Sequence, residues 1–289
     1  MLDTPVTHPS APKEEGPQAQ LLDPPETTSI PHQDPLTIQL DGPAIAGLAL
    51  GSILVVHLVG PLYSEILIVG SAALLLVYHD YRNFLNLGRG GVPSTFWGYL
   101  TVSRLRPFTI PDPFSPPRPD PKGIPRNGIL AGRNLPHRAG PRPRVAGIIP
   151  HRQLDQRGAD GPYLSIRDAI QNLASTHPER LTVGRSCFEM HDIGLFARRP
   201  VNETCQGEIL HHHASDRSMH MDLHPEDIRE VLEKGWGQRH PLARRGFHLQ
   251  ETFVMIYAPR DEDELRTVYQ IIEAAIWYIT AEEISTKAA

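Results

Sequence analysis

The chain has 289 residues, a formal net charge of −5 at pH 7 and two cysteines, Cys187 and Cys205. Two cysteines are too few for a disulfide framework, which fits a reducing compartment, although a single bridge between them stays open. The expected partners are a small-molecule substrate and no nucleic acid. The 29 prolines are concentrated before the C-terminal half, so the chain is not packed core throughout.

Residues 1–40 are rich in Pro, Thr, Gln and acidic side chains and show no apolar periodicity. Such a segment buries too little surface to offset its chain entropy, so we predict a disordered tail. A signal peptide is not indicated, because the region before the first apolar stretch is long and acidic rather than short and basic.

Residues 43–79 form a hydrophobic region, and from 43 to 78 Glu65 is the one charged residue. A membrane-spanning helix needs about 20 apolar residues. Gly60, Pro61 and Glu65 suggest a break, which leaves three arrangements: one kinked span, a two-span hairpin, or one span and a half-buried helix. A buried hairpin of a soluble protein is disfavoured, because about 35 nearly uncharged residues would need a very large core.

Basic residues follow the apolar region rather than precede it. Residues 82–157 carry 13 Lys or Arg and three acidic residues, whereas residues 1–41 carry one Lys and seven acids. The positive-inside bias therefore predicts that the C-terminal domain lies in the cytosol. We expect a single- or two-pass protein, with the lipid bilayer as a partner and an endomembrane as the location. Residues 80–127 indicate a basic, Pro-rich juxtamembrane linker, and residues 135–153 a loop that packs on the domain.

Residues 128–285 are predicted to form a single α+β domain. We expect a helix capped by Ser165, a helix opened by Pro225 and ended by Gly235, and a last helix capped by Asp261. Strand-like stretches lie at 185–190, 193–197, 208–213, 218–223 and 252–258. This order implies a mostly antiparallel sheet covered on one side by helices.

The most informative segment is 211–220, which reads HHHASDRSMH. If it is a hairpin turning at residues 214–217, His213 pairs with Ser218 and His211 pairs with His220. Alternation then puts these four side chains on one sheet face and His212 on the other. The cluster could supply a general base near neutral pH. His211, His213 and His220 could instead bind a divalent metal, or form a polar face without a role.

The loop at 234–242, KGWGQRHPL, is a second candidate. Glycine on either side permits close backbone approach to Trp236, which could wall a pocket for a flat ligand, while Arg239 could hold an anion. The alternative is that Trp236 fills the edge of the core. Phosphate loops, dinucleotide fingerprints, nucleophile elbows and cysteine-based zinc spacings are absent from the sequence.

Two blocks resemble the signature of the fungal luciferase family and its luciferase-like relatives: residues 231–242, VLEKGWGQRHPL, and residues 253–264, FVMIYAPRDEDE. The histidine segment that begins at Glu208 and contains Asp216 also resembles that family. Weaker similarity lies at 80–85, 98–99, 135–143 and 152–153. The resemblance covers about residues 65–280.

The resemblance implies an O2-dependent oxidation of a small hydroxylated 2-pyrone, 3-hydroxyhispidin, in which an endoperoxide forms, CO2 is lost and light is emitted. It implies no organic cofactor, with O2 as co-substrate. The expected catalytic residues are His211, His213, Asp216, Ser218 and His220. The expected substrate-binding residues are Trp236, Gln238, Arg239, His240 and Tyr257.

This chain departs from the luciferase pattern in its longer tail, its second apolar segment, its Pro-rich spacer and a histidine turn one residue shorter. A membrane-tethered domain that binds a small molecule or a protein without turnover is therefore the alternative function. A metal-dependent enzyme is the third hypothesis. The sequence does not determine the oligomeric state.

Overall fold

The computed structural model describes residues 29–36, 42–119, 123–202, 204–245 and 249–286. Most of the predicted disordered tail lies outside these residues. Residues 29–36 run along helix α2 (Pro61–Asn86) rather than standing apart from it. The amide of Gln33 donates to the Asn83 carbonyl at 2.8 Å, and the Asp34 N–H donates to the Asn83 side chain at 2.8 Å. Asn83, together with His79 and Asn86 of α2, therefore holds this piece of the tail against the helix.

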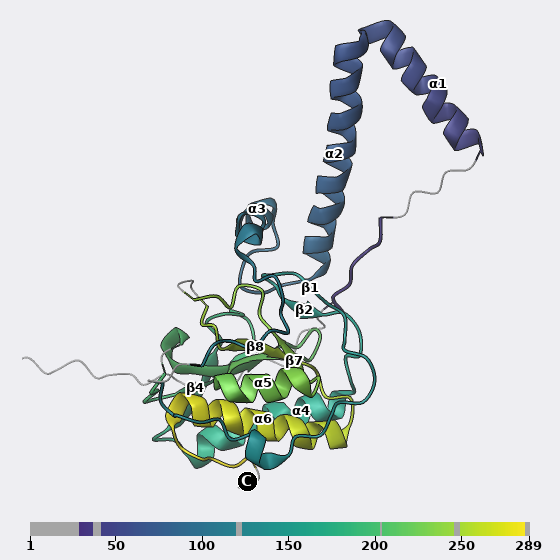
Figure 1. Ribbon diagram of the computed structural model, residues 1–289. Helices are drawn as coiled ribbons and strands as arrows, with labels where there is room; N and C mark the ends of the chain where they lie inside the picture. The colour runs from purple at the N-terminus through teal and green to yellow at the C-terminus, as the bar shows by residue number, and fades with distance from the viewer. Residues whose placement is uncertain (1–28, 37–41, 120–122, 203, 246–248, 287–289) are drawn as a thin grey trace, which may run out of the picture.

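Two separate helices, α1 (Gly42–Val59) and α2, carry the hydrophobic region. Gly60 breaks them apart with φ 85°, and Pro61 opens α2, where its missing N–H costs nothing. Figure 1 shows both helices projecting away from the domain, and their apolar side chains are largely exposed. Both are long and apolar enough to cross a membrane by length and composition.

The predicted linker contains a helix. Thr95 caps α3 (Phe96–Leu105) by accepting the Gly98 N–H, and the short 3-10 helix η1 (Arg106–Phe108) follows. Tyr99 of α3 packs with Phe84 of α2 in a small separate core. Residues 80–105 are thus more than a spacer, because α3 carries apolar side chains that meet the end of α2. Beyond η1, residues 109–119 contain no helix or strand, as their prolines predict.

The domain is built on a six-stranded sheet in which every neighbouring pair is antiparallel. Its strand order is β3-β4-β5-β6-β8-β7. The bounds are β3 Leu181–Arg185, β4 Ile193–Ala197, β5 Glu208–His212, β6 Met219–Asp222, β7 Gly237–Arg239 and β8 Phe253–Ile256. A two-stranded sheet, β1 (Val145–Ala146) with β2 (Arg152–Gln153), lies over it. The predicted α+β class with an antiparallel sheet is confirmed.

Three helices cover one face of the large sheet, as Figure 1 shows: α4 (Asp160–Thr176), α5 (Pro225–Glu233) and α6 (Glu262–Thr280). Asp261 caps α6 by accepting the Glu264 N–H at 2.9 Å, as predicted. Every third or fourth residue of α6 is buried in the main core. The predicted core positions of α6 are all buried: Leu265, Val268, Ile272, Ala275 and Ile279.

Three local predictions need correction. Helix α4 begins at Asp160, so Ser165 lies inside it, because Asp160 and Pro162 already suit a first turn. The strand expected at 185–190 is β3, the first strand of the large sheet, which ends at Arg185, and the residues after it form the turn into β4. Strand β7 was not predicted, because its three residues are too few for a pattern to show.

The two cysteines lie on neighbouring connections. Cys187 follows β3, and Cys205 begins the 3-10 helix η3 (Cys205–Gly207) before β5. Their Cα atoms are 6.3 Å apart, and the two residues form a disulfide. The single bridge that the sequence left open is therefore present, which does not fit the reducing compartment expected from the low cysteine count.

Candidate functional site

The histidine hairpin has the predicted register. His211 pairs with His220, His212 pairs with Met219, and the His213 N–H donates to the Ser218 carbonyl at 2.9 Å. Arg217 closes the turn in the left-handed region with φ 62°, and its N–H donates to the His213 carbonyl. The three predicted imidazoles therefore share one face of the sheet and are all buried.

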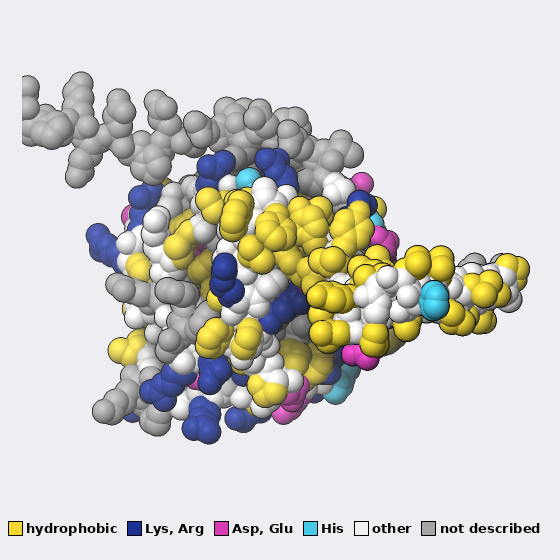
Figure 2. Space-filling view, turned by 90° about the horizontal axis from the view of Figure 1, so that it is seen from above, with side chains coloured by type: hydrophobic (Ala, Val, Ile, Leu, Met, Phe, Trp, Pro, Cys, Tyr) yellow, Lys and Arg dark blue, Asp and Glu magenta, His cyan; other side chains and the backbone are white. Residues whose placement is uncertain are grey.

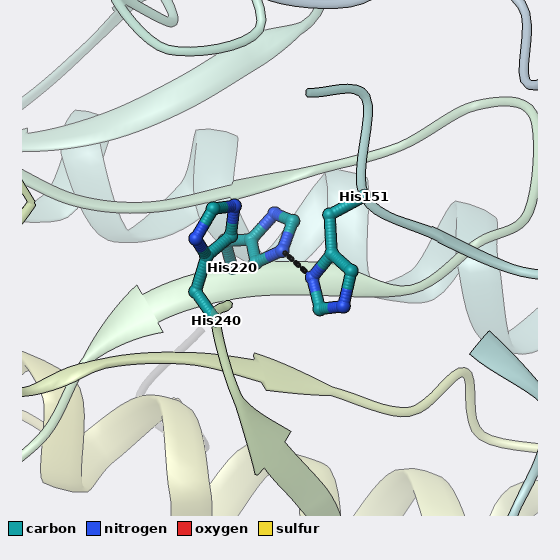
Figure 3. Close-up of side chains that lie close together, drawn as sticks. All are labelled: His151, His220 and His240. Carbon is teal, nitrogen blue, oxygen red and sulfur yellow. Dashed lines mark hydrogen bonds between the residues drawn. The ribbon is translucent and has the colours of Figure 1, made fainter. Parts of the chain in front are cut away.

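Two further histidines complete a cluster on this face. His240 follows β7, and His151 precedes β2 and comes from the loop that lies over the sheet. Figure 3 shows His220 between them, with a hydrogen bond of 3.1 Å joining His151 Nδ1 and His220 Nε2. The sequence pattern predicts a packing loop around His151 and does not mark it as a site residue.

Hydrogen bonds link these rings into a chain that ends on a carboxylate. His220 Nδ1 lies 3.0 Å from His213 Nε2, and His213 Nδ1 lies 2.9 Å from the Ser218 hydroxyl. Ser218 donates to Asp216 at 2.9 Å, and the Gln153 N–H donates to the same carboxylate. Because an ionised carboxylate only accepts, Asp216 fixes the direction of every donor in the chain.

The same direction extends to the other end of the chain. With His213 accepting at Nε2, a neutral His220 donates from Nδ1 and accepts at Nε2 from His151. His151 Nε2 then accepts from the Gln238 amide at 3.4 Å, and the Gln238 oxygen accepts the Tyr257 O–H at 3.1 Å. One set of tautomers therefore satisfies the whole path from Tyr257 to Asp216.

His211 belongs to a second branch. Its Nδ1 lies 2.7 Å from Glu208 Oε1, and Glu208 also accepts from the Ser186 hydroxyl and the Cys187 N–H. Both Glu208 and His211 are buried. The carboxylate therefore fixes which imidazole nitrogen bears the proton, and the disulfide loop fixes the carboxylate.

Comparison with known proteins connects this site to one family. The family model for the luciferase domain matches residues 206–275, the segment from β5 into α6. The chain is 31% identical over 239 residues to a luciferase of Neonothopanus nambi, covering 74% of this chain and 85% of that protein. It is 34% identical over 232 residues to a luciferase of Armillaria mellea, covering 71% and 82%. The chain belongs to the fungal luciferase family. No solved structure matches it.

The luciferase domain keeps these imidazoles in a shielded, neutral state. Burial lowers the pKa of His213 to about 3 and that of His240 to about 3. Burial, with the charges of the neighbouring rings, takes the pKa of His151 and His220 well below the usual value. Four imidazoles are therefore uncharged at pH 7 and supply no permanent positive charge.

A charged pair borders the cluster. Arg152 is buried against Glu189, and its guanidinium also donates to the Arg89 carbonyl. Glu189 Oε2 lies 3.9 Å from His213 Nε2. Burial raises the pKa of Glu189, and Arg152 opposes that shift. Arg152, which follows His151 in the loop over the sheet, thus places the Glu189 carboxylate beside the rings.

The predicted substrate-binding residues divide into two groups. Gln238, His240 and Tyr257 lie in or beside the histidine cluster. Trp236 does not: it packs in the main core, and its indole N–H donates to the Pro136 carbonyl at 2.7 Å. The structure therefore agrees with the alternative in which Trp236 fills the core.

Arg239 also points away from the rings. Its guanidinium donates to the backbone carbonyls of Ser115, Ala243 and Glu251, which ties the loops around β7 together. Because those oxygens already occupy it, a substrate anion would have to displace them.

An apolar wall closes the cluster, and a cavity lies beyond it. The Phe253 ring stacks on His220 with centroids 5.2 Å apart, and Phe188 lies 4.9 Å from Phe253. A cavity of about 370 Å³ sits between α2, α3 and the loop before His151. Its lining includes Ile148 and Ile149, which come two and three residues before His151, and Pro241, which follows His240. The lining of this cavity contains none of the five cluster histidines.

Proposed function

We propose that this chain is a membrane-anchored enzyme that uses O2 to oxidise a hydroxylated 2-pyrone, such as 3-hydroxyhispidin or a related phenolic metabolite, with loss of CO2. The observation that carries the proposal is the chain of buried, neutral imidazoles ending on Asp216 in a domain of the luciferase family. The reaction requires no organic cofactor.

The chemistry follows from the demands of such a substrate. Removal of the enol proton leaves an electron-rich anion that can donate electrons to O2. A neutral imidazole in the cluster accepts this proton, and the hydrogen bonds through His213 and Ser218 stabilise the resulting positive charge against Asp216. Burial keeps water away from the peroxide that forms, whose breakdown releases CO2.

The membrane anchor is part of the proposal. Helices α1 and α2 cross or enter the bilayer, and Figure 2 shows hydrophobic side chains along them and on the adjoining domain face. Trp97 of α3, whose side chain is 73% exposed, lies with Phe96 and Phe108 where an aromatic belt would meet the headgroups. Arg104 and Arg106 beside them suit anionic lipid.

Two observations disagree about the side of the membrane on which the C-terminal domain lies. The basic residues after α2 favour the cytosol, whereas the disulfide Cys187–Cys205 favours an oxidising compartment. We retain the cytosolic placement as the proposal. Alkylation of free thiols in sealed vesicles, before and after reduction, tests it: reduced cysteines reached only through the cytosolic side agree with it, and a stable bridge on the lumenal side contradicts it.

The test of the reaction uses the full chain in detergent or nanodiscs. Mixed with 3-hydroxyhispidin in air, it should consume O2 and release CO2, with light emission recorded in parallel. His137→Gln, a change at an exposed histidine, should leave the rate unchanged. Binding of the pyrone without O2 consumption, and with affinity unchanged by His211→Ala, would instead establish the non-catalytic binding domain.

A further inference from the structure

We propose that His211, His213 and His220 form a binding site for one divalent transition-metal ion. The proposal shares its residues with the proposed function but does not depend on the identity of the substrate. One ligand nitrogen of each ring lies within 4.8 Å of the other two, and all three residues are buried. The site comes from two paired strands, so its geometry is set by the hairpin.

The ring positions match those of a three-histidine centre. The centroids of the three ring pairs are 4.7, 5.2 and 5.3 Å apart. Two imidazoles at tetrahedral positions on a zinc-sized ion place their nitrogens about 3.3 Å apart, from bonds of ~2.0–2.1 Å. His213 Nε2 and His220 Nδ1 are 3.0 Å apart, so little movement would admit an ion between them.

Each ring is held by its other nitrogen. His211 Nδ1 is bonded to Glu208, His213 Nδ1 to Ser218 and through it to Asp216, and His220 Nε2 to His151. Histidines that bind metal are oriented in this way by an outer carboxylate or acceptor. The inward nitrogens would bind the ion in place of the hydrogen bond that now joins His213 Nε2 and His220 Nδ1, and His220 would then donate from Nε2 to His151 Nδ1.

Charge favours a cation at this point. Three buried carboxylates lie against the three rings or their hydrogen-bond partners, namely Glu189, Glu208 and Asp216. Among the described residues that contact them, Arg152 is the buried cation. Three negative charges and one positive charge leave a net charge of about −2, which one divalent ion would balance.

A second set of three histidines shares His220 but is less suited to metal. It consists of His151, His220 and His240, drawn in Figure 3. His240 Nδ1 accepts the Leu242 N–H at 3.1 Å, and the ring also hydrogen-bonds to the backbone of Ile148. Its one lone pair is therefore used, so it lacks the electron pair that a neutral imidazole gives to a metal.

The donor set selects the class of ion. Three imidazoles with a nearby carboxylate suit Fe2+, Co2+, Ni2+, Cu2+ or Zn2+, whereas Mg2+ and Ca2+ prefer sites made of oxygen atoms. Co2+ is the useful probe, because its visible absorption reports the coordinating ligands directly.

The experiment titrates chelator-treated full chain in detergent with Co2+, followed by visible spectroscopy and calorimetry. The wild type should bind one Co2+ per chain. His211→Gln should lower the affinity by at least about 100-fold, and Glu208→Gln by about 10–100-fold. His240→Gln shares the cluster but not the proposed ligands, so it should change the affinity less than about 3-fold. Thermal melts confirm that each variant is folded.

Two results would overturn the proposal: a wild-type chain that binds no Co2+, Fe2+ or Zn2+ in stoichiometric amount, or binding that His240→Gln abolishes and His211→Gln leaves intact. The outcome is separable from that of the proposed function. Stoichiometric Co2+ binding without pyrone oxidation contradicts the reaction and keeps the site. Oxidation by chelated chain that binds no metal contradicts the site and keeps the reaction.

Discussion

The two faces of the six-stranded sheet are both buried, yet they are built from opposite kinds of side chain. The face under α4, α5 and α6 is aliphatic, and its contacts are hydrophobic. The other face carries imidazoles, carboxylates and amides joined by hydrogen bonds. The end of strand β5 contributes to both faces, because His212 points toward α4, while His211 and His213, the residue after the strand, point into the cluster. Histidine therefore packs as a ring on the helix face and takes part in hydrogen bonds on the other face.

The sharpest way to test this contrast is to remove one ring of the chain. His213→Gln should lower the rate of pyrone oxidation by about 10²–10⁴-fold, because a general base or its orienting partner is lost. Its effect on the melting temperature should be smaller than that of a core cavity. The rate and melting curve are measured on the full chain, with His137→Gln as the matched control. An unchanged rate would remove His213 from the catalytic path.

Truncation of a side chain on the helix-covered face should lower stability and leave the reaction rate unchanged. Ile272→Ala removes a buried side chain of α6 and should cost about 2–5 kcal/mol of unfolding free energy, from lost transfer and cavity terms. The rate per folded molecule should stay near that of the wild type. Denaturant titration and active-site-normalised kinetics check both. A large loss of rate with full stability would show that the two faces are not independent.

Reduction of the disulfide should affect both properties. The bridge spans a sequence separation of 18, which corresponds to about 3 kcal/mol in the loop-entropy model. Because the Cys187 N–H donates to Glu208, which holds His211, reduced protein should also lose activity before it unfolds. Melting curves and rates with and without reductant test this. Equal stability in both states would show that the bridge is not formed in solution.

Acid should destabilise the cluster face. The folded-state pKa values of His213 and His240 are lowered below the unfolded value, so their contribution to stability is present above pH 6.5 and is lost as the pH falls toward 3. Each such histidine contributes a slope of up to about 1.4 kcal/mol per pH unit. His240→Gln should reduce this slope between pH 6.5 and 4.5. The same slope in the variant would contradict the assignment.

The smallest effect is expected where a histidine lies on the aliphatic side. His212 stacks on Tyr163 at 5.0 Å, and neither of its ring nitrogens has a hydrogen-bond partner among the described residues. His212→Phe keeps the stacking and removes two unpaired polar atoms, so it should raise stability by about 1 kcal/mol and leave the rate unchanged. Destabilisation in the melting curve would show that His212 makes a polar contact.

Local patterns determined much of this molecule. The register of the hairpin followed from strand alternation and a short turn, which place His211, His213 and His220 on one face without reference to distant residues. The α6 core face, the cap at Asp261 and the break at Gly60 are local in the same sense. Each depends on side chains within a few positions of one another.

Tertiary structure alone decided which distant groups joined that face. His151 and Arg152 come from a loop about 60 residues before the hairpin, and no periodicity marks them as site residues. Trp236 and Arg239 adjoin the cluster residues Gln238 and His240 in sequence, but one enters the core and the other binds backbone carbonyls. The local sequence determines on which face of the sheet a strand side chain lies. The residues that cover that face are determined only when the layers pack, because packing depends on burial over the whole fold.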